Sequence, residues 1–311
     1  NFDEVQDFEG QIRSLAGGTG LMSDAAFNTG TRNQPLGLAK AGVSTDLDAL
    51  AAYVGSLSVM PQSAQRSASG ALTAAASAGR SVFANQNCAS CHGGLTFASS
   101  GLLAVDVGTL KASSGMRLGA ALTGIDVPTL RDVASTGPYL HDGSVATLTG
   151  AISAHRGVNL GDADLANLAA YLGQVGSEEA LAPAALPARA VRCAAERGTC
   201  TLPSGVPATV YYGANGSYTS QGTLTGSVAC NNTTFGDPLS GTVKACYYVA
   251  AVKCAAERST CAVPAGAPVT VLYGAGGRYV ARIVAGGTSV ACSNSSFTDP
   301  IVGTGKACWL R

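Results

Sequence analysis

Two cysteines and a histidine stand together in the stretch NCASCH, as Cys88, Cys91 and His92. This spacing fits a redox dithiol, half of a zinc site or a haem attachment site, in which both thiols form thioethers with the haem vinyl groups. A thioredoxin-type dithiol requires a βαβ context, whereas the sequence before the motif predicts a helix over about 71–84. A zinc half-site requires a second pair nearby, and the next cysteine is Cys193. The motif therefore predicts covalent haem, with His92 on one face of the iron.

The second face of the iron needs another ligand, which in such proteins is most often His or Met. The stretch SVATLTGAISAH predicts a short helix with an N-cap at Ser144 and an apolar stripe at Leu148 and Ile152. His155 lies on the same face as that stripe, so it is expected to point toward the core. Two alternatives stay open: His155 lies at the surface near a helix C-terminus, or Met116 is the ligand instead. The full set of candidates is Met22, Met60, Met116, His141 and His155.

The segment after the haem motif carries the sequence Pro-Thr-Leu-Arg-Asp-Val at 128–133 and Pro-Tyr-Leu-His-Asp-Gly at 138–143. Together with DEVQDFEGQIR at 3–13, these blocks resemble the di-haem cytochrome c peroxidase superfamily, which includes the MauG-like proteins. The resemblance covers residues 1 to about 176. It implies a mainly α c-type cytochrome domain with haem c, whose distal ligand follows the second block by one short helix. On this chain that ligand is His155, which implies an iron bound by two histidines.

Two further residues in these blocks are candidates for contact with the haem. The guanidinium of Arg131 matches a carboxylate in a fork, so it is expected either to pair with a haem propionate or to form a structural salt bridge. His141 lies in a tight turn, where it is expected to form a local hydrogen bond or to face a propionate.

The chain departs from the peroxidase pattern because it holds one CxxCH motif, whereas members of that family carry two haems. The stretch TDLDALAAYVGSL at 45–57 matches ADLANLAAYLGQV at 163–175. Because the second stretch ends the predicted cytochrome domain (59–177), we expect 1–58 to be the tail of an upstream cytochrome-like domain that lacks its own haem motif. The apolar stripe of the first stretch predicts an amphipathic helix and consists of Leu47, Leu50, Val54 and Leu57.

The C-terminal part repeats itself. The sequence 191–203 recurs as 252–264, and 228–248 recurs as 290–310, each with its cysteines in place. We therefore expect two small all-β modules, called module 1 (191–250) and module 2 (251–311). A segment with several prolines and alanines, 178–190, is expected to be a semi-rigid linker.

Each module holds four cysteines, and a chain of this size needs such staples because its core is small. Four cysteines allow three pairings. We favour the local one without excluding a nested one: Cys193–Cys200, Cys230–Cys246, Cys254–Cys261 and Cys292–Cys308. The predicted fold class is thus a multidomain protein with a mainly α c-type cytochrome domain and two disulfide-stapled β-modules.

Charge and composition limit the partners. Lys+Arg and Asp+Glu number 19 each, so the neutral chain lacks the positive charge that nucleic acid binding requires. No apolar run reaches the roughly 18 residues of a membrane span. The disulfides predict an oxidising compartment, so the protein is expected to be periplasmic or extracellular.

Electron transfer is the first functional hypothesis, because two axial histidines leave no open face on the iron for peroxide. The partner would be a redox protein or another haem. One alternative is a peroxidase- or oxygenase-like enzyme whose second haem is absent from this chain. Another is an adhesive protein whose modules bind polysaccharide or another copy of the chain through their tyrosines and Trp309.

Overall fold

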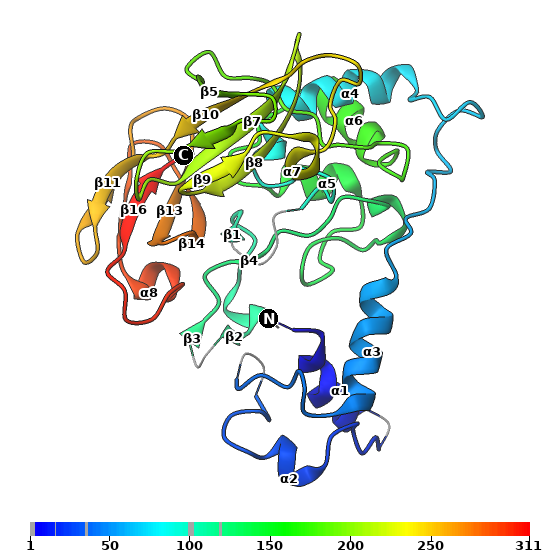
Figure 1. Ribbon diagram of the computed structural model, residues 1–311, viewed down its shortest axis with the longest axis vertical. Helices are drawn as coiled ribbons and strands as arrows, with labels where there is room; N and C mark the ends of the chain where they lie inside the picture. The colour runs from blue at the N-terminus through cyan, green and yellow to red at the C-terminus, as the bar shows by residue number, and fades with distance from the viewer. Residues whose placement is uncertain (1–3, 16, 35–36, 99–102, 118–119) are drawn as a thin grey trace. The chain divides into compact units, whose positions relative to one another are not determined.

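The computed structural model describes residues 4–15, 17–34, 37–98, 103–117 and 120–311, which form two compact units (Figure 1). The first unit holds the residues up to Val59 together with Met116–Ala120, and the second holds Met60–Gly115 and Ala121–Arg311.

The first unit is built from short helices around a buried carboxylate. It contains η1 (Val5–Phe8), α1 (Glu9–Ser14), α2 (Asp24–Phe27) and α3 (Thr45–Ser56). Glu9 is fully buried and accepts hydrogen bonds from the backbone N–H groups of Leu21 and Met22 and from the Arg13 guanidinium. These bonds satisfy the buried charge and tie the loop before α2 to α1.

Helix α3 is the helix that the sequence predicts over 45–57. The Ser44 hydroxyl caps it by accepting a hydrogen bond from the Leu47 N–H at 3.3 Å. The predicted apolar stripe is buried only at Leu47, because Leu50, Val54 and Leu57 are 38%, 43% and 62% exposed.

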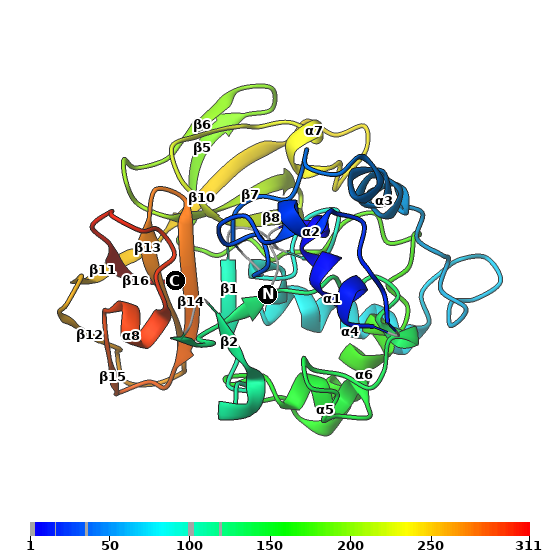
Figure 2. The same cartoon turned by 90° about the horizontal axis from the view of Figure 1, so that it is seen from below.

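The helical part of the second unit contains α4 (Ala74–Asn85), α5 (Leu148–Ser153) and α6 (Asp162–Leu172). Helices α4 and α6 lie side by side (Figure 2). A Cβ atom at Gly79 would come within 1.9 Å of the Asn167 carbonyl oxygen, so only glycine permits this approach. Phe83 and Tyr171 fill the contact with their rings in an edge-to-face arrangement, 5.6 Å between centroids.

The C-terminal region is β-rich, and its two modules have the same strand order. In module 1 the order is β5 (Val191–Ala195), β10 (Ala245–Ala250), β7 (Ala208–Ala214) and β8 (Ser217–Leu224). In module 2 it is β11 (Val252–Ala256), β16 (Ala307–Leu310), β13 (Val269–Ala275) and β14 (Arg278–Val284).

The module 2 sheet continues into two strands that precede both modules in the sequence. Strand β14 pairs in parallel with β1 (Leu103–Asp106), which pairs in turn with β4 (Ile125–Asp126). The two parts therefore share one six-stranded sheet. The smaller elements are η2 (Cys88–Ser90), η3 (Ala112–Ser114), η4 (Val133–Ser135), β2 (Met116–Arg117), β3 (Ala120–Ala121), β6 (Thr199–Thr201), β9 (Ser227–Ala229), α7 (Asn232–Phe235), β12 (Thr260–Ala262), β15 (Ser289–Ala291) and α8 (Asn294–Phe297).

Disulfides and a buried lysine hold each module together. The four bonds follow the local pairing: Cys193–Cys200, Cys230–Cys246, Cys254–Cys261 and Cys292–Cys308. In module 1 the buried Lys244 ammonium lies 3.4 Å from Glu196 and 3.1 Å from Asp237. The corresponding cluster of module 2 consists of Lys306, Glu257 and Asp299.

The segment 178–190, expected to be a semi-rigid linker, is packed into the second unit. Ala182 is fully buried and its N–H donates to the Gly94 carbonyl at 3.1 Å, and the Ala184 N–H donates to Tyr218 at 2.9 Å. A free spacer would leave these groups to water. The segment instead fixes module 1 against the helical part, because its small side chains fit into the core.

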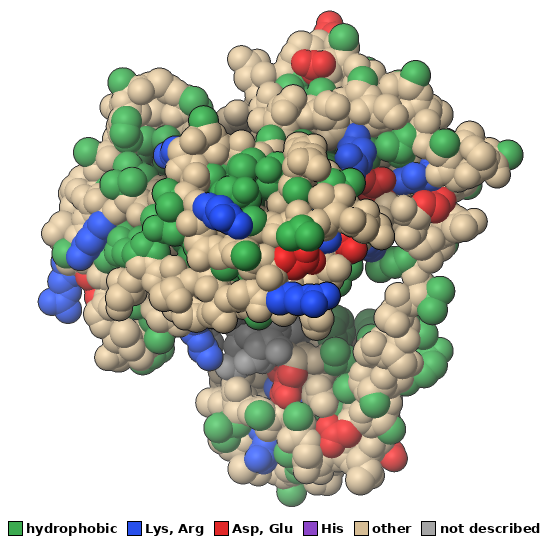
Figure 3. All heavy atoms as spheres, turned by 45° about the horizontal axis from the view of Figure 1, so that its top comes forward, with side chains coloured by type: hydrophobic (Ala, Val, Ile, Leu, Met, Phe, Trp, Pro, Cys, Tyr) green, Lys and Arg blue, Asp and Glu red, His purple; other side chains and the backbone are tan. Residues whose placement is uncertain are grey.

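Charged side chains of both signs are few and scattered on the face shown in Figure 3, most of which consists of uncharged polar, backbone and hydrophobic atoms. Among the residues that the structure describes, no helix has the length and apolar character required to cross a membrane.

Candidate functional site

The two motif cysteines lie in a tight turn directly after α4. Asn87 adopts a left-handed conformation, with φ of 56°, so the chain turns away from the axis of α4 at this residue. The chain then turns again through η2, so that the His92 N–H donates to the Cys88 carbonyl at 2.9 Å. We call residues 88–92 the attachment loop. This turn brings both thiols and the imidazole into one short segment.

The thiols of the attachment loop are not joined to each other. Burial, together with the nearby Cys91 thiol, raises the pKa of the Cys88 thiol to about 12. A redox dithiol depends on a thiolate that forms near neutral pH, so this environment is unsuited to thiol–disulfide exchange. The two free thiols agree with the haem attachment that the CxxCH spacing predicts.

The His92 ring is oriented by two backbone carbonyls. Its Nδ1 lies 3.1 Å from the Pro128 oxygen and 3.3 Å from the Phe97 oxygen, and because both partners are acceptors, Nδ1 carries the proton. The Nε2 lone pair is therefore free for a metal, and a carbonyl on the opposite nitrogen is the usual second partner of a metal-bound imidazole. Burial and the nearby His155 lower the pKa of His92 to about 4, so the ring stays neutral.

Sequence reasoning did not identify Pro128 as the partner of His92. The residue lies in the Pro-Thr-Leu-Arg-Asp-Val block, which pointed to a family but not to a function of its carbonyl group. A backbone acceptor has no side-chain signature, so only the fold reveals this contact.

His155 lies close enough to His92 for its charge to contribute to the lowered pKa of His92. It follows α5 by two residues, and its Nδ1 lies 2.8 Å from the Ala151 carbonyl oxygen. Its Nε2 is thus also free of any hydrogen bond within the described residues. The N-cap predicted at Ser144 is wrong: Thr147 caps the helix by accepting from the Gly150 N–H at 3.1 Å.

Arg131 binds backbone carbonyls rather than a carboxylate. It donates to Leu95 at 2.7 Å, to Gly176 at 2.7 Å and to Ala180 at 3.2 Å, and its guanidinium lies 5.1 Å from the centre of the Phe97 ring. In the described residues it forms no ion pair, so the expected structural salt bridge is absent. Its contacts instead hold the segment that contains Pro128, whose carbonyl oxygen faces the His92 ring.

Two of the other candidates, His141 and Met116, lie at the surface. The His141 Nε2 is 2.7 Å from the Ser114 hydroxyl, which agrees with a local hydrogen bond in that turn. Its neighbour Asp142 pairs with Lys111 at 2.6 Å, which holds the pKa of the Asp142 carboxyl well below its usual range. The Met116 side chain is 74% exposed.

Both modules contact the attachment loop, which sequence reasoning missed. The Ser220 hydroxyl of β8 donates to the Ala89 carbonyl at 3.4 Å. From module 2, Trp309 packs in the cluster that includes Cys91, and an Arg311 Nη2 lies 3.2 Å from the Cys91 sulfur. The loop is therefore covered by residues far away in the sequence.

Comparison with known proteins supports this assignment of the helical part. A family model described as "Cytochrome C oxidase, cbb3-type, subunit III" matches residues 74–172, from the start of α4 to the end of α6. An uncharacterized protein of Acanthamoeba polyphaga mimivirus is 29% identical over 143 residues, which cover 39% of this chain and 69% of that protein. Residues 74–172 are thus a c-type cytochrome domain, whereas the finer resemblance to di-haem peroxidases stays a prediction.

A c-type cytochrome domain holds its haem covalently, and the residues present fit that group. Two unpaired thiols at the required spacing precede a neutral histidine with a free Nε2. When bound, the haem supplies a one-electron couple at the iron.

Proposed function

We propose that this chain transfers electrons through one haem attached at Cys88 and Cys91, with His92 and His155 on the two faces of the iron. The proposal rests on the hydrogen bonding of the two imidazoles, which is the same in both. Each Nδ1 is hydrogen-bonded to a backbone carbonyl, of Pro128 or of Ala151, and each Nε2 has no partner among the described residues.

The chain supports axial ligation by keeping both rings in one orientation and one tautomer. A carbonyl acceptor on Nδ1 increases the electron density on Nε2 and prevents ring rotation. Met116 receives no support as an alternative ligand, because its sulfur lies on a side chain that is mostly exposed.

Two fixed histidines favour an electron carrier over an enzyme. Peroxide chemistry requires an exchangeable position on the iron, and His155 occupies that position in this proposal. The protein then acts by holding the haem in a constant ligand set, so that little rearrangement accompanies the gain or loss of an electron. A second imidazole in place of a thioether also favours a lower reduction potential.

We further propose that the protein works in the periplasm or outside the cell. Four disulfides form and persist in such oxidising compartments and are rare in the cytosol.

The test is the visible spectrum of the purified haem protein. We expect one covalent haem per chain and a six-coordinate low-spin spectrum that neither cyanide nor peroxide changes. The variant His155→Ala should become high-spin and bind cyanide, whereas the control His141→Ala should keep the low-spin spectrum. A high-spin wild-type protein, or rapid consumption of peroxide, would support the peroxidase-like alternative and refute the carrier.

A further inference from the structure

The last strand of module 2 brings a charged side chain to the attachment loop. Strand β16 lies between β11 and β13 in the sheet, which fixes its position. Arg311 follows β16, and its N–H donates to the Thr270 carbonyl at 2.9 Å, so the backbone is held up to this residue. The indole of Trp309 packs in the same cluster as Cys91. Arg311 therefore approaches the loop from a rigid sheet.

The guanidinium of Arg311 lies directly beside the second attachment cysteine. Its Nη2 is 3.2 Å from the Cys91 sulfur, and its Nη1 is buried without a hydrogen-bond partner among the described residues. A Cβ atom at Gly222 of β8 would come within 2.8 Å of Nη1, so the glycine leaves room for this group. Both modules thus shape the space that the guanidinium occupies.

Among the ion pairs of the described residues, none joins the Arg311 guanidinium to a side-chain carboxylate. No opposite charge offsets the field of an unpaired cation. When the cation is half-buried, the surrounding protein also screens that field less than water does. The Arg311 guanidinium lies beside the Cys91 sulfur, to which the haem would be attached.

We propose that Arg311 is a positioning residue of the haem site, which holds the Cys91 sulfur and raises the reduction potential of the iron. This inference rests on the proposed function, because it requires the haem at Cys91. A thioether at Cys91 would join this sulfur to a substituent of the haem ring, so the guanidinium beside the sulfur would lie close to the bound haem. The oxidised iron carries one positive charge more than the reduced iron, and a nearby positive charge therefore favours the reduced form.

The experiment is a spectroscopic redox titration of the haem protein, three variants at Arg311 and one control variant. Arg311→Gln and Arg311→Met remove the charge, and Arg311→Lys keeps it. Arg192→Gln is the matched control, because Arg192 is exposed on β5, the opposite edge of the module 1 sheet from β8. We expect both neutral variants to shift the reduction equilibrium about tenfold toward the oxidised form, equivalent to about 59 mV for one electron. Arg311→Lys and the control should stay within about twofold of the wild type.

The outcomes separate this inference from the proposed function. If the wild-type protein carries low-spin haem and the neutral variants keep its potential within twofold, the role of Arg311 is refuted while the carrier stands. The same conclusion follows if Arg192→Gln shifts the potential as much as Arg311→Gln does. If the wild-type protein attaches no haem, the proposed function itself fails. A variant that is destabilised without a change of potential would indicate a structural role and also overturn the inference.

Discussion

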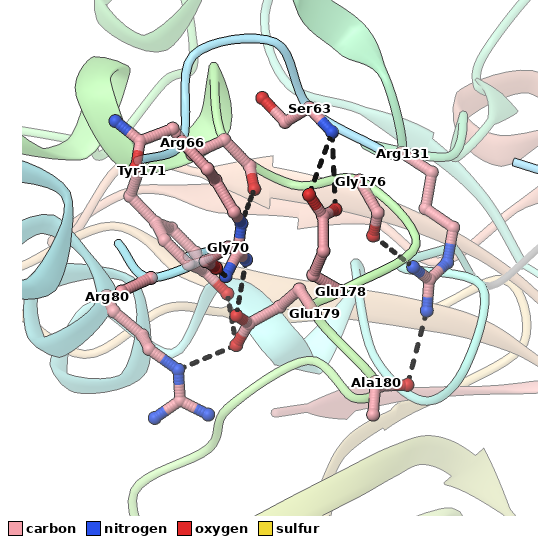
Figure 4. A network of polar contacts seen from close by, with 12 residues as sticks. Ser63, Arg66, Gly70, Arg80, Arg131, Tyr171, Gly176, Glu178, Glu179 and Ala180 are labelled. Carbon is pink, nitrogen blue, oxygen red and sulfur yellow. Dashed lines mark hydrogen bonds and ion pairs between the residues drawn. The ribbon is translucent and has the colours of Figure 1, made fainter. Parts of the chain in front are cut away.

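Glu179 is the centre of a buried ionic network at the end of the cytochrome domain. Its carboxylate is 2.9 Å from an Nη2 of Arg66, 2.6 Å from the Nε of Arg80 and 3.3 Å from the Tyr171 hydroxyl (Figure 4). The side chains of Glu179 and Arg66 are 8% and 7% exposed. Figure 4 also shows Arg131 directed at Gly176 and Ala180 on either side of this residue. The network therefore fixes the start of the segment that leads to module 1.

We predict that Glu179→Ala lowers the free energy of unfolding by about 3 kcal/mol. Removing one partner of a buried ion pair costs about 3–5 kcal/mol, because the other charge stays buried without compensation. The lower end applies here, since Arg80 is 44% exposed and can turn to water. Arg66 also keeps its hydrogen bonds to the carbonyls of Gln174 and Gly70, each at 3.0 Å.

The assay is urea unfolding of the haem protein, followed by the haem absorbance and by the fluorescence of Trp309. Glu178→Ala is the matched control, because Glu178 is half-buried and, among the described residues, accepts only from the Ser63 N–H, at 3.1 Å. The control should cost about 1 kcal/mol, the typical contribution of one hydrogen bond. The reasoning is refuted if Glu179→Ala unfolds within about 0.5 kcal/mol of the wild type, or if the control costs as much.

Three predictions concern module 1. Lys244→Met should destabilise the protein by about 2 kcal/mol in a thermal unfolding experiment, because it leaves Glu196 and Asp237, which are 20% and 33% exposed, without their cation. Replacing Cys230 and Cys246 together by alanine should cost about 3 kcal/mol, since their bond closes a loop with a sequence separation of 16. Hydrogen bonds from the Lys244 backbone N–H and the Tyr212 hydroxyl hold the pKa of Glu196 below its usual 4.5. The folded state therefore binds this proton less readily than the unfolded state, and stability present above pH 4.5 is lost as the pH falls below it. Glu196→Gln should flatten that part of the stability–pH curve, and an unchanged slope would contradict the assignment.

Local signals in the sequence predicted the elements that form locally. The attachment loop, α4 and α6 depend on residues close in the chain, and the local sequence indicated them. The local disulfide pairing was favoured while a nested one stayed open, and the structure has the local pairing. The beginning of α5 was misplaced for a physical reason. Val145 pairs with Tyr139 as an isolated bridge, which keeps the backbone before Thr147 extended.

Contacts between distant segments escaped prediction. Arg131 was expected to meet a carboxylate, but its five N–H donors suit backbone carbonyls equally well, and only the fold brings Leu95 and Gly176 to it. The approach of Arg311 to Cys91 joins residues at opposite ends of the second unit. The residue types in either segment do not indicate that it contacts the other segment.

The pairing of β1 with β14 has a consequence for the order in which the chain is completed. Leu103 lies opposite Tyr279, so the edge of β1 that faces away from β4 has no partner strand until nearly the whole of module 2 has been made. At about 5–20 residues per second, this interval lasts roughly 10–35 s during synthesis. Such long-range pairings also form slowly once both strands exist. The contacts that Ser220 and Arg311 make with the attachment loop therefore form only after the modules that carry these residues have been made.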